Sequence, residues 1–106
     1  MKEKKRYLIY EVKAEKTLEP REVKQVLEKK MLDFLGELGY GKAGIIIMDE
    51  FQDNRGIIRM QTKSLDNVKA ALTLVKKIGD QKVIVKSVGV SGILNKAKSK
   101  FLNGGR

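Results

Sequence analysis

Few side chains in this sequence could carry out chemistry. Its 106 residues include no cysteine and no histidine, which excludes zinc fingers, disulfide frameworks and catalysis by Cys–His or Ser–His pairs. General acid–base chemistry would fall to carboxylates, Lys or Tyr. Asp49, Glu50 and Asp53 could form a magnesium site, but Asp49 and Glu50 are neighbours in a strand-like stretch, so their side chains should point to opposite faces. We interpret them as charges at a hairpin tip and expect no catalytic residue, no metal site and no cofactor on this chain.

Two glycine-rich patterns resemble phosphate-binding loops. Residues 39–44 fit G-x-G-x-x-G by letter, and residues 36–42 fit most of a Walker loop, with Ala43 in place of the Ser or Thr that should hold magnesium. Both motifs need a strand before them and a helix after them, so that a helix N-terminus faces the phosphates. Here a helical pattern precedes and a strand pattern follows. We therefore interpret these glycines as a helix stop and a flexible link.

The positive charge is concentrated at the two ends of the sequence. Residues 2–6 carry a net charge of +3 and residues 92–106 a net charge of +4, so +7 of the formal +10 lies there. This asymmetry favours a polyanionic partner, although solvated ends that only keep the protein soluble remain the alternative. No stretch approaches the ~20 apolar residues of a membrane span, and no secretory signal opens the chain. We expect a cytoplasmic protein without a membrane partner.

The elements that would position these charges follow from hydrophobic periodicity. Strands are predicted over residues 6–13, 43–48, 56–63 and 82–90. Helices are predicted from Pro20 to the glycines at 36–41, from Ser64 to Gly79-Asp80, and from Ser91 onward. Asp53-Asn54 has the composition of a tight turn between the two middle strands.

This order predicts an α+β fold of the ferredoxin-like, RRM-like kind. The split βαβ arrangement, β-α-β-β-α-β, forms an antiparallel sheet with two helices on one face. The C-terminal helix should cover the other face, where Leu94 and Phe101 could be buried. That would explain why residues 43–48 are apolar at successive positions, as in a strand covered on both faces. We expect a single domain over residues 1–106, with residues 102–106 disordered.

Two further apolar patterns lead to predictions about burial. In the first helix, one buried stripe is predicted to contain Val23, Leu27, Met31, Phe34, Leu35 and Leu38. In the first strand, Leu8, Tyr10 and Val12 should share one face, which leaves Tyr7 on the other.

The third strand invites comparison with an RNA-recognition signature. Residues 55–60 supply the basic residue and the glycine of that signature but none of its aromatics. Without a stacking platform, reading of single-stranded bases is disfavoured, so any RNA should be bound through backbone phosphates and shape. In the C-terminal helix, two lysines lie four residues apart on the side away from the apolar stripe, and a third flanks it. The candidate RNA-binding residues are Lys4, Lys5, Arg6, Arg59, Lys63, Lys96, Lys98 and Lys100.

Over nearly its full length the sequence resembles the archaeal ribonuclease P protein component 2 family, which is related to the eukaryotic Pop/Rpp-type subunits. The resemblance rests on Arg6-Tyr7-Leu8, on Gly56-Ile57-Ile58-Arg59 with Lys63, and on Val88-Gly89-Val90-Ser91-Gly92-Ile93 leading to Lys100-Phe101-Leu102. One departure is Ile93, which stands where related sequences often have Thr and so lacks the hydroxyl.

The resemblance implies a subunit that supports the catalytic domain of ribonuclease P RNA together with protein component 3. The RNA, with magnesium, would remove the 5′ leader from precursor tRNA, which this chain would contact only indirectly. The family allows a homodimer within a heterotetramer. Two alternatives stay open: a small-molecule-sensing ferredoxin-like regulatory domain, which would pair sheets between subunits, and a stand-alone acid–base or phosphatase enzyme, which would need activity without added RNA.

Overall fold

The computed structural model describes the backbone of residues 4–102 and the side chains of residues 4–99. Its strands are β1 (Lys5–Lys13), β2 (Ile46–Gln52), β3 (Arg55–Gln61), β4 (Lys77–Ile78), β5 (Gln81–Lys82) and β6 (Ile84–Ser91). Its helices are α1 (Pro20–Ala43), α2 (Leu65–Thr73) and α3 (Leu94–Leu102), and a short 3₁₀ turn (Thr62–Ser64) precedes α2.

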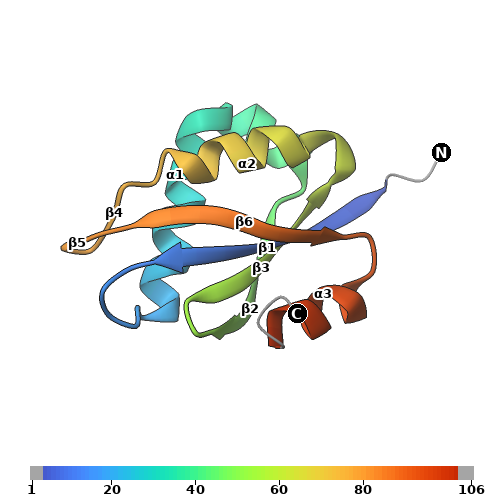
Figure 1. Ribbon diagram of the computed structural model, residues 1–106. Coiled ribbons are helices and arrows are strands. Elements are labelled where there is room, and N and C mark those ends of the chain that lie inside the picture. Colours follow the sequence, from blue (N-terminus) through green and yellow to red (C-terminus); the bar gives the residue numbers. More distant parts are fainter. Residues whose placement is uncertain (1–3, 103–106) are drawn as a thin grey trace.

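The main sheet has the strand order β2-β3-β1-β6, and all neighbouring strands are antiparallel. Helices α1 and α2 lie on one side of it and α3 on the other (Figure 1). The predicted ferredoxin-like α+β fold is therefore confirmed, and α3 covers the second face as expected.

Successive residues of the central strand β1 contribute to two separate apolar clusters. Leu8, Tyr10 and Val12 point toward α1 and α2, where the larger core also takes Ile58 and Met60 from β3. Helix α1 contributes Val23, Leu27 and Met31 to this core, and α2 contributes Val68, Ala71 and Leu72. The period of two along β1 places alternate residues on opposite faces.

The smaller cluster lies under α3. It consists of the buried residues Ile9, Ile57 and Ala97, with Tyr7 and Met48 packed against them. Because an alanine has no side chain beyond Cβ, Ala97 allows α3 to lie close to the sheet. Tyr7 and Tyr10 thus face opposite sides of the sheet, as predicted.

Helix α1 differs from the prediction after its fourth turn. Gly36 has φ 78° and ψ 166°, which interrupts the helix, but the chain returns to helical geometry until Ala43 and ends at Gly44 in the left-handed region. The glycines at 39 and 41 therefore lie inside the helix. The interruption changes the rotational phase of the residues that follow it, and Leu38 is 72% exposed. Phe34 lies before the break, at the edge of the buried stripe, and is 44% exposed. The predicted burial of both residues is wrong.

Strand β2 also differs from the prediction, because it lies at the edge of the sheet. Ile47 is buried, but Ile46 is 48% exposed, so the start of this strand is not covered on both faces, although Met48 packs under α3. The strand runs on to Gln52, and the reversal is the two-residue turn Asp53-Asn54, whose φ values of 55° and 60° suit a hairpin turn. The predicted turn is confirmed.

The region after α2 holds a feature that periodicity did not predict. The helix ends at Thr73, and Gly79-Asp80 forms the turn of a small β4–β5 hairpin instead of the helix end. Smaller shifts occur elsewhere: β3 ends before Lys63, β6 begins at Ile84, and α3 begins at Leu94. Leu102 is the last residue of α3. Residues 103–106, the rest of the predicted disordered end, lie outside the described residues, so that prediction stays untested.

Tyr10 crosses β3 at Gly56, its cross-strand partner. A Cβ atom at position 56 would collide with the hydroxyl oxygen and the ring of Tyr10. Phe51 on β2 packs against the far side, with ring centroids 6.4 Å apart at a tilt of 36°. The glycine is thus required by a close approach of a side chain, and it lets Tyr10 reach from β1 across to β2.

We predict that Gly56→Ala lowers the free energy of unfolding by about 1–3 kcal/mol, because the added methyl group overpacks the Tyr10 ring. Gly41→Ala is the matched control. A Cβ there meets nothing within 4 Å, and alanine favours a helix interior, so this variant should gain up to about 1 kcal/mol. Urea unfolding measures both, and equal effects would contradict the packing of Tyr10 across Gly56.

Burial raises the pKa of the Tyr10 hydroxyl well above its usual range. The unfolded chain therefore releases the Tyr10 proton first, at about pH 10. This contribution to stability is complete below that pH and is lost as the pH rises toward the folded-state pKa. Relative to Tyr10→Phe, we predict that the wild type loses up to about 1.4 kcal/mol of unfolding free energy per pH unit above pH 10. Urea unfolding at pH 9 to 11.5 tests this; parallel curves for the two proteins would contradict it.

Candidate nucleic-acid interface

Three of the predicted lysines lie at one end of the main sheet. Lys5 pairs with Gln61, and the carbonyl oxygen of Lys4 accepts a hydrogen bond from the backbone N–H of Thr62 at 2.9 Å. This pairing brings Lys63, more than 50 positions away in the sequence, next to the start of β1. Lys4, Lys5 and Lys63 are all exposed. We call these three residues the basic end.

Arg6 joins this end of the sheet to the start of α3. Its Nη1 donates a hydrogen bond to the carbonyl oxygen of Lys5 at 3.1 Å. The guanidinium also lies against Gly92, since a Cβ there would be 3.1 Å from Nη1. Half-buried, Arg6 therefore supports the backbone of the basic end as well as adding a charge.

Arg59 lies two residues before Gln61, on the α3 side of the sheet. Its cross-strand neighbours are Tyr7 on β1 and Ile46 on β2. The Nε atom of Arg59 is buried, and it has no hydrogen-bond partner among the described residues. An unsatisfied buried donor on a cation is costly, so an anion that reached this guanidinium would bring a favourable contact.

The lysines of α3 are not equivalent. Lys96 is exposed, and the described residues include no ion-pair partner for it. Lys98 pairs with Glu50 of β2, with Nζ 3.2 Å from Oε2, so its charge is partly used to hold α3 on the sheet. The side chain of Lys100 lies outside the described residues.

A turn stabilised by Ser91 leads into α3. The backbone N–H of Ile93 donates to Ser91 Oγ at 3.1 Å, and that hydroxyl donates to the carbonyl oxygen of Ile93 at 3.0 Å. The same carbonyl accepts from the N–H of Ala97. Ser91 thus stabilises the turn before the helix, which begins at Leu94 and not at Ser91 as predicted, and Ile93 is exposed.

The sheet face that could stack bases is covered. Ile57, which follows Gly56 where the RNA-recognition signature has an aromatic, is buried beneath α3. This supports the expectation that bases are not read on this surface. Among residues 4–99, no three acidic side chains gather in a way that could hold a metal ion. Within the described residues, no helix is long and apolar enough to cross a membrane.

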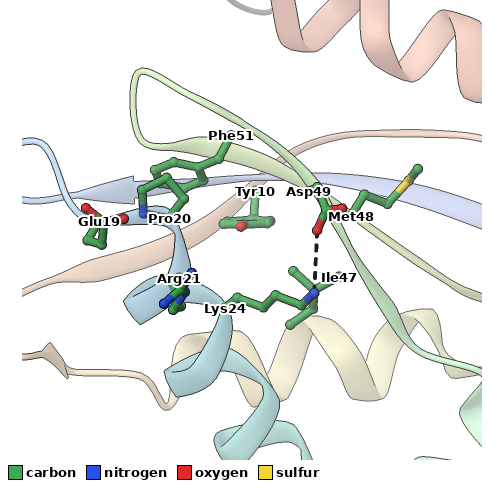
Figure 2. Close-up of a pocket in the computed structure, with 9 residues that line it drawn as sticks. All are labelled: Tyr10, Glu19, Pro20, Arg21, Lys24, Ile47, Met48, Asp49 and Phe51. Atoms are coloured by element: carbon green, nitrogen blue, oxygen red, sulfur yellow. Dashed lines mark ion pairs between the residues drawn. The ribbon is translucent and has the colours of Figure 1, made fainter.

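A hollow of about 360 Å³ lies between the N-terminus of α1 and strand β2 (Figure 2). We call it the α1 pocket; it is lined by Tyr10, Glu19, Pro20, Arg21, Lys24, Ile47, Met48, Asp49 and Phe51. Lys24 Nζ lies 3.5 Å from Asp49 Oδ1 across its mouth. Sequence reasoning named none of these residues as candidate RNA-binding residues. The sequence did contain one indication of a basic site there, because Arg21 and Lys24 lie one helical turn apart just after Pro20.

The sheet order and the three helices define a ferredoxin-like α+β protein, and the exposed lysines at one end of its sheet make it a basic one. The model of the Rpp14/Pop5 family matches residues 6–102. The chain belongs to this family.

Individual relatives agree with the family assignment. The chain is 35% identical over 102 residues to ribonuclease P protein component 2 of Archaeoglobus fulgidus, covering 96% of this chain and 92% of the relative. It is 38% identical over 105 residues to ribonuclease P protein component 2 of Pyrococcus furiosus, covering 97% and 87%. A chain in the cryo-EM structure of yeast ribonuclease MRP shares the fold, with a TM-score of 0.69, 12% identity, and coverage of 98% and 95%.

Proposed function

We propose that this chain is an RNA-binding protein subunit of ribonuclease P that supports the catalytic RNA in removing the 5′ leader from precursor tRNA. The observation that carries the proposal is the identity of more than a third with relatives named ribonuclease P protein component 2, over almost their whole length. The absence of cysteine and histidine fits a subunit that leaves the chemistry to RNA.

The basic residues suggest how such a subunit would act. Phosphates of a folded RNA repel one another, and lysines at fixed positions neutralise them while releasing counterions. The basic end and Arg59 offer such charges from a rigid sheet, and Lys96 offers one from α3. Contacts of this kind fix position and orientation without reading sequence.

The remaining parts of the proposal concern partners and location. The proposed partners are the catalytic domain of ribonuclease P RNA and protein component 3, with precursor tRNA contacted indirectly. Magnesium would be bound by the RNA, and the complex would act in the cytoplasm.

We predict that the triple variant Lys4→Ala, Lys5→Ala, Lys63→Ala lowers the slope of log affinity for the RNA against log salt concentration by about two to three, since each lost phosphate contact removes about 0.7–0.9. The matched control removes the same charge from the opposite end of β1, at the exposed Lys13, Lys82 and Lys86. Filter binding over a salt series measures both slopes. Equal slopes for the two triple variants would contradict the basic end as an RNA contact.

The α3 lysines extend the same measurement. Lys96→Ala should lower the slope by about one. Lys98→Ala should change it less, because Glu50 already neutralises part of that charge. The reverse order would show that the Lys98–Glu50 pair opens when RNA binds.

Reconstitution tests the function itself. We predict that omitting this chain from a mixture of ribonuclease P RNA, protein component 3 and precursor tRNA slows cleavage by about tenfold at low magnesium, a loss on the scale of a few missing phosphate contacts. Higher magnesium should partly restore the rate, because added cations replace the protein's charges. Unchanged cleavage without the chain would refute the proposal.

A further inference from the structure

The α1 pocket contains a polar group for which the protein supplies no partner. Tyr10 is 2% exposed, and its hydroxyl forms no hydrogen bond with any described residue. Among the described residues, the fully buried polar side-chain atoms without a partner are Arg59 Nε and Thr62 Oγ1, so the Tyr10 oxygen is still accessible and can be reached from the pocket. Figure 2 shows the Tyr10 ring among the side chains that line the pocket, with Phe51 and Pro20 on one side and Asp49 on the other. A tyrosine hydroxyl is protonated at neutral pH, and burial raises the pKa of Tyr10 further, so this hydroxyl is available as a donor.

The first turn of α1 adds donors at the same place. Glu19 occupies the N-cap position, yet its side chain makes no capping hydrogen bond. Pro20 has no N–H, and the backbone N–H groups of Arg21 and Glu22 have no partner among the described residues. A helix N-terminus with free N–H groups carries a partial positive charge that favours an anion.

Two cations complete the donor set. Arg21 and Lys24 both line the pocket from α1. The Asp49 side chain that pairs with Lys24 is 98% exposed, and an ion pair with such exposure contributes little. An anion that enters the pocket could therefore replace Asp49 as the partner of Lys24, with only a small loss of free energy from the broken ion pair.

The two acidic residues at the pocket limit the charge of that anion. Glu19 and Asp49 balance Arg21 and Lys24, so the formal charge of the lining side chains is zero. A free phosphate is largely a dianion above its second pKa, which lies at about 6–7, and would be repelled by both carboxylates. A phosphodiester carries a single negative charge and suits the site better.

We propose that the α1 pocket binds one backbone phosphodiester of an RNA. Its donors are the Tyr10 hydroxyl, the Arg21 and Lys24 side chains, and the backbone N–H of Arg21; the N–H of Glu22 follows in the same first turn of α1 and would report on binding there. The inference rests on the proposed function but adds a second contact, because the pocket lies toward the end of β1 opposite the basic end. An RNA could thus be held at two separate places on this small protein.

The full chain, labelled with ¹⁵N, allows a direct test with dimethyl phosphate, inorganic phosphate and precursor tRNA as probes. Dimethyl phosphate, a phosphodiester, should shift the amide signals of Arg21 and Glu22 more than inorganic phosphate does at pH 7.5. Precursor tRNA should shift or broaden the same signals. If no probe affects them, the site does not exist; if inorganic phosphate alone does, the RNA source is wrong.

Variants separate the pocket from the basic end. Tyr10→Phe removes only the hydroxyl oxygen and should weaken RNA binding about three- to tenfold, the scale of one hydrogen bond to a charged group, without changing the salt slope. Tyr40→Phe, on α1 beyond the break at Gly36, is the matched control and should have no effect. Arg21→Gln should weaken binding and also lower the slope by about one.

The outcomes distinguish this inference from the proposed function. If RNA binds the wild type and depends on the basic end but not on Tyr10 or Arg21, the pocket proposal fails and the ribonuclease P proposal stands. If the chain binds no RNA at all, both fail.

Discussion

A four-stranded sheet that is apolar on both faces must be covered on both sides, and this constraint governs the molecule. Three consecutive residues of β1, Leu8, Ile9 and Tyr10, are almost fully buried. Such a strand cannot leave one face to water without exposing a large apolar patch. Helices α1 and α2 cover the first face, and α3, held by Ala97 and by the Lys98–Glu50 pair, covers the second. Helix α3 therefore covers the sheet face that carries Ile9 and Ile57.

The charges are arranged around this closed sheet. Where Arg55 and Glu11 face each other across β3 and β1, a half-buried ion pair 3.0 Å long neutralises both. At the other end of β1, lysines from distant parts of the sequence stand together without acidic partners among the described residues. Near the hairpin, the Tyr10 hydroxyl and the first turn of α1 converge on a pocket with balanced charges. Under the two proposals made above, the first region would neutralise phosphates generally and the second would hold a single phosphate in a fixed geometry.

Much of the fold could be predicted from the sequence, because local patterns determine it. The alternation of side chains along β1 predicted which residues lie on each face of the sheet, and Asp53-Asn54 predicted the hairpin turn. The predictions that were wrong concern features that depend on residues far apart in the sequence or on the strand order. The break at Gly36 changed which side of α1 is buried, since a glycine can continue or interrupt a helix with little difference in its own neighbourhood. Ile46 is exposed because β2 lies at a sheet edge, which only the strand order reveals. At the candidate site, the residue types were predictable, but the pairing of Lys98 with Glu50, 48 positions apart, was not.

The position of β1 in the sheet has a consequence for how the protein is made. This strand is the first to emerge during synthesis, yet its two neighbours, β3 and β6, follow about 50 and 80 residues later. The apolar side chains of β1 therefore lack their partners at first, and Val85 of β6 cannot join the larger core until that strand has left the ribosome. Topologies with such distant pairings fold slowly and leave adhesive strands uncovered in the meantime.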